Sequence, residues 1–155
     1  MQSEPALPSP DATVRPRRRS GLTPLLATEV RAFAEAVFAT REGPPSAEHL
    51  DYTLDELGQL VGHAGTRARM LFRASVLTMA FLIPPILLFR FRRFSRLSME
   101  DRLEALHRAE GSPAGLAVFL VRAMTSFVFY EHPEGARSIG WDQRCMLLPK
   151  PSEAP

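Results

Sequence analysis

The chain has 155 residues, of which 45% are hydrophobic, so it is long enough for one domain with its own core and is not made mostly of membrane-spanning segments. Its 19 basic and 17 acidic residues leave a formal net charge of only +2, which excludes a surface dominated by positive charge, as in many nucleic-acid-binding proteins. The single cysteine, Cys145, excludes an internal disulfide and a cysteine-based zinc site.

Residues 1–20 contain four prolines and no apolar period, which predicts a disordered leader. Its basic run resembles the start of a twin-arginine export signal. The following segment, however, carries Glu29, Arg31 and Glu35 where such a signal requires an uncharged stretch. We therefore expect a cytoplasmic protein that is not exported. The leader arginines are interpreted as a solvated arm, with weak attraction to acidic lipids or nucleic acid as the alternative.

Residues 23–65 show the signals of two consecutive helices. Thr23 is a predicted N-cap with Pro24 at the first helical position. We expect this first helix to stop at residues 43–45, Gly-Pro-Pro, and Ser46 to cap the second helix, which Gly62 and Gly65 end. The apolar faces expected from helical spacing are Leu26, Val30, Phe33 and Val37 in the first helix, and Leu50, Leu54, Leu57 and Val61 in the second.

Two further helices are predicted towards the C-terminus. Ser98 begins a capping box for a helix that carries Leu103 and Leu106 to a stop at Gly111. Ser112 and Pro113 open another, which ends at His132-Pro133 because proline restricts the residue before it. Its apolar residues are Leu116, Phe119, Leu120, Ala123, Met124 and Phe127. No stretch alternates like a strand, so we predict an all-α fold, a single-domain irregular helical bundle of five to six helices over residues 21–146, with a flexible tail at 147–155.

The longest apolar run, residues 74–89, follows Thr66, which opens a third helix. Its sixteen uncharged residues would make about 24 Å of helix, less than a hydrocarbon core of about 30 Å. Pro84 and Pro85 would also leave carbonyl groups without partners in lipid. We therefore predict a core helix over about 67–83, a break at the prolines, a short segment at 86–94, and solubility without detergent. An interfacial helix and a membrane span remain as alternatives.

Four arginines follow the apolar run, namely Arg90, Arg92, Arg93 and Arg96. They are interpreted as a solvated face, a phosphate-facing rim or a partner contact.

The sequence contains none of the motifs of a self-sufficient active site. A phosphate-binding glycine loop, a nucleophile elbow, a zinc-protease helix and a dinucleotide fingerprint are all absent. The four histidines have no companion at ligand spacing and are interpreted as surface or capping residues, namely His49, His63, His107 and His132. We therefore expect a protein that is not an enzyme and that, on its own, binds no FAD, NAD, haem or metal.

Residues 91–142, FRRFSRLSMEDRLEALHRAEGSPAGLAVFLVRAMTSFVFYEHPEGARSIGWD, are similar to a small module that accompanies glucose-methanol-choline flavin oxidoreductases. Gluconate 2-dehydrogenase subunit 3-like proteins and the N-terminal region of long-chain alcohol oxidases contain this module. The shared elements are the step at 92–98, an acidic helix start, a long apolar helix ending at Tyr130, then Pro133 and the Ile-Gly-Trp-Asp ending at 139–142. Residues 22–38 resemble its first helix, so the resemblance covers most of residues 22–145.

The sequence departs from the module at two internal positions. Phe38-Ala39-Thr40 stands where an Ile-Pro or Phe-Pro step usually ends the first helix. Gly135 stands where an aromatic residue is usual, which we interpret as the loss of a packing anchor.

The resemblance implies a non-catalytic accessory subunit that docks onto an FAD-dependent alcohol or sterol-type oxidoreductase, with the flavin held by the partner. The alternative function is a membrane-associated helical protein anchored by residues 74–94 at the inner membrane face. A DNA-binding regulator is disfavoured and no nucleic-acid partner is expected, because no helix-turn-helix pair with a basic recognition helix is visible. Trp141 is expected to close the core, with partner docking as its alternative role. The candidate partner contacts are Arg90, Arg92, Arg93, Arg96, Tyr130 and Trp141.

Overall fold

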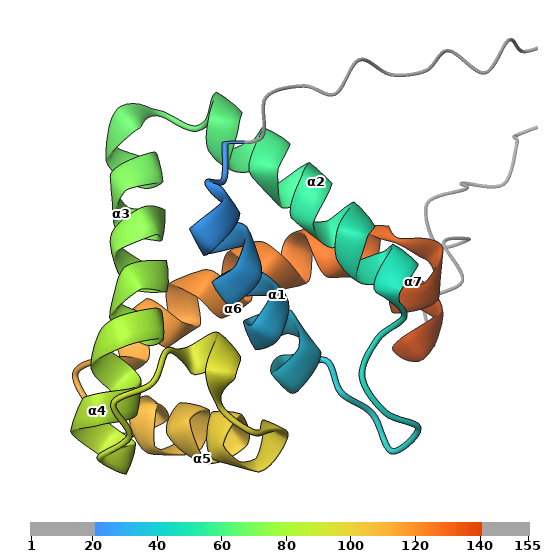
Figure 1. Ribbon diagram of the computed structural model, residues 1–155. Helices are drawn as coiled ribbons and strands as arrows, with labels where there is room; N and C mark the ends of the chain where they lie inside the picture. Colours follow the sequence, from blue (N-terminus) through green and yellow to red (C-terminus); the bar gives the residue numbers. More distant parts are fainter. Residues whose placement is uncertain (1–20, 141–155) are drawn as a thin grey trace, which may run out of the picture.

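A computed structural model describes residues 21–140 of the chain (Figure 1). The predicted leader, the predicted tail and Trp141 lie outside the described residues. Because α3, the π-helical turn η1 and α4 form one continuous helix, the described part has six helices, and it contains no β-strand beyond one isolated bridge between Thr40 and Gly43. The predicted all-α fold is confirmed. The elements are α1 (Pro24–Val37), α2 (Ala47–His63), α3 (Thr66–Leu77), η1 (Thr78–Leu82), α4 (Ile83–Leu88), a 3₁₀ turn η2 (Phe94–Arg96), α5 (Met99–Glu110), α6 (Gly115–Glu131) and α7 (Pro133–Ser138).

Helix α1 lies at the centre of the bundle, with α2, α3, α5, α6 and η2 packed around it (Figure 1). It begins as predicted, because the Thr23 hydroxyl accepts a hydrogen bond from the Leu26 N–H and Pro24 occupies the first helical position. Val30 and Phe33 are completely buried, so the periodic face of the sequence is the face that forms the core.

Helix α1 ends at Val37, so the prediction that it continues to residues 43–45 is wrong. Phe38, which follows Val37, stacks on Phe129 of α6 with ring centroids 3.9 Å apart. The Gly-Pro-Pro signal marks the end of the following loop, where Ser46 caps α2 as predicted by accepting a hydrogen bond from the His49 N–H. Tertiary aromatic packing thus decides where α1 stops.

Helix α2 passes close to the backbone that leads into α1. The Gly21 N–H donates to the Gly58 carbonyl at 3.0 Å, and a Cβ on Gly21 would lie 2.6 Å from the Gly62 nitrogen. Gly21 therefore allows the two backbones to approach closely, because a side chain at this position would clash with the backbone of α2. Helix α2 ends at His63, between Gly62 and Gly65, as predicted.

The helix Thr66–Leu88 does not break at Pro84 and Pro85, contrary to the prediction. The π-helical turn η1 precedes them, and the Ile83 N–H bonds to the Thr78 carbonyl five residues back. The prolines then open α4 at positions that need no helical N–H donor. The chain leaves the helix at Phe89, which has a φ of 55°. No helix forms over 89–93, so the predicted segment 86–94 is wrong as well.

This continuous helix has 23 residues and is therefore about 35 Å long, and it is long and apolar enough to cross a membrane by length and composition. Only one of its sides faces the core, through Phe72, Val76, Met79 and Ile83. Of its most apolar 18-residue window, 39% is buried. The predicted core helix is therefore buried on one side only.

The step at residues 92–98 is shaped by contacts with α1. Phe94 and Leu97 are buried, and the Glu29 carboxylate of α1 accepts hydrogen bonds from the Ser95 N–H at 2.9 Å and the Ser95 hydroxyl at 2.7 Å. Arg102 of α5 donates to the Ser95 carbonyl at 2.7 Å. This part of the motif therefore has a structural role, which is to hold the connection between α4 and α5 on α1.

Candidate docking surface

Helix α6 is apolar on both its inner and its outer side. Val118, Val121 and Val128 face the core. On the outer side, Leu116, Phe119 and Phe127 are 67%, 63% and 74% exposed. A helix that is hydrophobic all round is normally covered on every side by protein or lipid. The sequence identifies these residues only as apolar. The structure shows that they form a row that faces away from the core.

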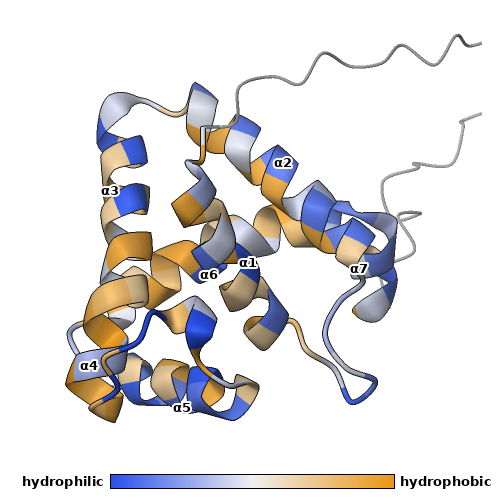
Figure 2. Cartoon of the chain, in the orientation of Figure 1, coloured by the Kyte–Doolittle hydropathy of each residue, from blue (hydrophilic) through white to orange (hydrophobic). Residues whose placement is uncertain are grey.

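A second exposed row runs along the helix Thr66–Leu88, where Leu82 and Ile86 are 51% and 63% exposed. A groove of about 460 Å³ lies between this second row and the residues that precede α6, with Leu82 and Ile86 on one side and Pro113 and Ala114 on the other. Figure 2 shows the hydrophobic colouring concentrated on the lower part of α3, on α4 and along α6. We call the two exposed rows together the apolar surface, made of Leu71, Leu82, Ile86, Leu116, Phe119 and Phe127.

The four candidate arginines, Arg90, Arg92, Arg93 and Arg96, are all exposed and lie on the segment that follows α4. This segment also carries Phe89 and Phe91, which are 81% and 91% exposed. The Arg93 guanidinium lies 5.5 Å from the centre of the Phe81 ring, within the range of a cation–π contact. Apolar and cationic side chains are therefore combined at this end of the long helix.

Tyr130, the other described candidate, lies at the far end of α6 from this segment and is half-buried. Its ring packs edge-on against Phe38 and Phe129, with centroid distances of 5.8 and 5.4 Å. The structure therefore does not bring Tyr130 together with the arginines, and gives it a packing role.

Four aromatic side chains form a continuous stack beside Tyr130, which we call the ring column. Phe38 stacks on Phe129 at 3.9 Å, Phe129 on His49 at 3.9 Å, and His49 on His132 at 4.3 Å. The column joins the end of α1, the start of α2 and the end of α6. A cleft of about 570 Å³ opens beside it, lined among others by Phe38, His49, Phe129 and Glu134.

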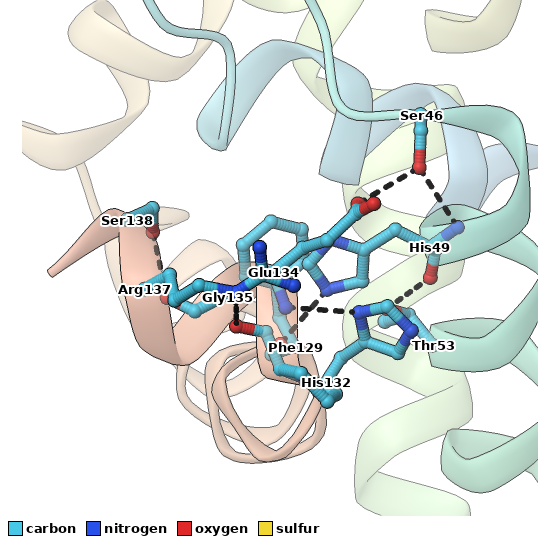
Figure 3. Close-up of polar contacts among 10 residues, drawn as sticks. Ser46, His49, Thr53, Phe129, His132, Glu134, Gly135, Arg137 and Ser138 are labelled. Carbon is cyan, nitrogen blue, oxygen red and sulfur yellow. Dashed lines mark hydrogen bonds and ion pairs between the residues drawn. The ribbon is translucent and has the colours of Figure 1, made fainter. Parts of the chain in front are cut away.

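His49 is buried in this column and has a fixed orientation (Figure 3). Its Nε2 donates to the Phe129 carbonyl at 2.9 Å, and its Nδ1 lies 3.6 Å from a Glu134 carboxylate oxygen, which also accepts from the Ser46 hydroxyl at 3.0 Å. Burial lowers the pKa of His49 below its ordinary value, and nearby His132 acts in the same direction. At neutral pH the ring is therefore uncharged.

Gly135 allows α7 to pack tightly beneath this column. A Cβ at this position would lie 2.2 Å from the Phe129 carbonyl oxygen and 3.2 Å from His49 Cε1. The interpretation of Gly135 as a lost packing anchor is therefore wrong, because any side chain here would displace α7 from the end of α6.

We predict that Gly135→Ala lowers the free energy of unfolding by about 2–3 kcal/mol, because the new methyl group overpacks against backbone that cannot move independently. Gly62→Ala is the matched control. A Cβ there has only ordinary contacts at 3.9 Å with Gly21, so removing a helical glycine should leave stability unchanged or raise it by up to about 1 kcal/mol. Urea denaturation followed by circular dichroism measures both. Equal effects of the two substitutions would contradict the proposed close packing.

Sequence reasoning missed the grouping of His49, His132 and Glu134, whose ligand atoms all lie within 4.8 Å of one another. His49 and His132 are distant in sequence, and only the packing of α2 against the α6–α7 corner brings them together. The interpretation as a surface or capping residue is wrong for the buried His49, whereas His132 caps α7 as predicted, because its Nδ1 accepts a hydrogen bond from the Glu134 N–H. Neither a protein-family model nor a curated protein nor a solved structure matches this chain.

Proposed function

We propose that the chain is a non-catalytic accessory protein that docks through its apolar surface onto an FAD-dependent alcohol or sterol-type oxidoreductase. The observation that carries this proposal is the outer side of α6, where Leu116, Phe119 and Phe127 are exposed on a helix whose inner side already fills the core. Monomeric soluble proteins rarely expose large contiguous apolar patches, and such patches mark interaction sites. The class of partner follows from the resemblance of residues 91–142 to the flavoprotein-associated module.

The structure supports an accessory role in a second way. The motif residues Phe94, Ser95 and Leu97 are used to hold the connection between α4 and α5 on α1. The module therefore serves as a rigid scaffold that presents the apolar surface, and the flavin and the reacting groups belong to the partner.

Flavin content tests the proposal that only the partner binds the flavin. The chain purified alone should show no flavin absorbance, and its complex with the oxidoreductase should carry only the flavin of that partner. Stoichiometric flavin bound to this chain alone would overturn the proposal.

Membrane association is the second candidate function. By its length and composition the helix Thr66–Leu88 could cross a bilayer, although core helices of soluble proteins can have the same length and composition. Arginines and exposed phenylalanines follow it directly, a combination that suits the interface of an anionic membrane.

We predict that, if the apolar surface contacts lipid, the protein floats with anionic phosphatidylserine vesicles in a density gradient and that replacing Arg90, Arg92, Arg93 and Arg96 with glutamine reduces this binding severalfold. The docking proposal predicts instead that the protein stays in the soluble fraction with both anionic and neutral vesicles. Recovery of the protein from cells only in carbonate-resistant membranes would favour a spanning helix over both.

A further inference from the structure

We infer that His49, His132 and Glu134 form a binding site for a divalent transition-metal ion of the zinc class. The inference is independent of the proposed docking function. Two imidazole nitrogens and one carboxylate oxygen lie within 4.8 Å of one another. Such a donor set suits Zn²⁺, and three protein ligands would leave one coordination position for water or another ligand.

The surroundings of His49 match those of a metal ligand. Its Nε2 donates to the Phe129 carbonyl at 2.9 Å, which fixes the ring and leaves Nδ1 free to bind. Metal-bound histidines usually hold their second nitrogen in this way, because the outer hydrogen bond sets the tautomer and the ring orientation. The Ser46 hydroxyl holds the Glu134 carboxylate at 3.0 Å and completes the outer shell.

The contact between His49 and Glu134 supplies a second argument. With its proton on Nε2, the ring directs the Nδ1 lone pair towards the Glu134 carboxylate oxygen, 3.6 Å away. Two hydrogen-bond acceptors that face each other repel, whereas a cation between them attracts both.

Binding requires a reorientation of the His132 ring. Tetrahedral zinc ligands at about 2.1 Å from the ion lie roughly 3.4 Å from each other, closer than the donors are here. The His132 ring is stacked on His49 at 4.3 Å, and its Nδ1 accepts the Glu134 N–H at 3.3 Å. Binding therefore requires the His132 ring to leave its stack on His49 and to give up its hydrogen bond from the Glu134 N–H, while His49 stays fixed. His132 is half-buried and the Glu134 carboxylate is partly exposed, so both side chains have room to move.

The ion would link the first turn of α2 to the corner between α6 and α7. It would thus stabilise the region in which Phe38, Phe129 and Tyr130 also pack. Since the ligands must be deprotonated, the affinity should fall as the pH is lowered through the range in which histidine titrates.

The test is a titration of the tag-free full chain with zinc chloride in a Cys145→Ser background, followed by calorimetry and by thermal unfolding. We expect one ion per chain at micromolar zinc, and a weakening of about tenfold or more for each of His49→Gln, His132→Gln and Glu134→Gln. The control variants His63→Gln and His107→Gln replace the other two histidines of the sequence and should bind like the parent.

Thermal unfolding separates metal loss from misfolding. Zinc should raise the midpoint of the parent protein but not that of Glu134→Gln, whose partly exposed side chain can be changed without opening the core. Absence of stoichiometric binding at micromolar zinc, or an equal loss in the control variants, would overturn the inference.

Discussion

Replacing Glu29 with alanine is expected to lower the free energy of unfolding by about 3 kcal/mol, a large part of the stability of a small domain. Glu29 is 1% exposed and accepts two hydrogen bonds from Ser95, one from the backbone N–H and one from the hydroxyl. Its removal leaves the half-buried Ser95 N–H without its acceptor and opens a cavity beneath η2, so the segment that carries Phe94 and Leu97 loses its attachment to α1.

Two further variants make the Glu29 result specific. Glu29→Gln keeps the shape of the side chain and one acceptor oxygen, so it should lower the free energy of unfolding less than Glu29→Ala does. Glu42→Ala removes an exposed loop glutamate and should change stability by less than about 0.5 kcal/mol. Urea denaturation monitored by circular dichroism gives all three values. A Glu29→Ala protein as stable as the Glu42→Ala control would show that the two Ser95 hydrogen bonds do not hold η2 on α1.

Placing charge on the apolar surface is expected to abolish partner binding while leaving the fold intact. The double variant Leu82→Glu and Phe119→Glu replaces two residues that are more than half exposed. The free energy of unfolding should therefore change by less than about 1 kcal/mol for the pair. Burying two unpaired carboxylates in an apolar interface should weaken docking by at least about 30-fold, the effect of one strong interface residue.

Leu103→Glu is the matched control for this surface, because Leu103 is an exposed leucine among the acidic residues of α5 and not part of the apolar surface. Affinity for the oxidoreductase, measured by biolayer interferometry, should be unchanged in this variant. If Leu103→Glu weakened binding as much as the double variant, the docking site would have to include α5, and the surface defined by α6 and the long helix would be wrong.

The local signals of the sequence predicted the helix starts well. Thr23, Ser46 and Ser98 each accept the expected hydrogen bond from a backbone N–H of the first turn. Such caps depend only on residues three positions apart, so they are visible without knowledge of the fold. The apolar period likewise identified the buried faces of α1 and α2, because one side of each helix packs on the same core.

The behaviour of Pro84 and Pro85 could not be predicted from local rules. Two adjacent prolines break a regular α-helix, but the π-helical turn at Thr78–Leu82 changes the hydrogen-bond register before they are reached. The end of α1 could not be predicted for a related reason, because Phe38 stacks on Phe129 of α6, which is distant in the sequence.

The candidate sites depend even more on long-range packing. The exposure of the outer row of α6 could not be predicted, because the apolar residues of this helix occur on all its sides and do not show which side faces the core. The sequence also did not predict that His49 and His132 lie together. Their rings stack because α2 packs against the corner between α6 and α7. Of the candidate contacts, the four arginines were correctly placed together because they are neighbours in the chain.

The most direct test of the account is to mix the purified chain with an FAD-dependent alcohol or sterol-type oxidoreductase of the same organism, and to measure the mass of the product by size-exclusion chromatography with light scattering. The docking account predicts a complex of one chain with one flavoprotein. It also predicts that the Leu82→Glu and Phe119→Glu double variant elutes separately from the flavoprotein while remaining folded. Separate elution of the unmodified chain, or an intact complex with the double variant, would contradict it.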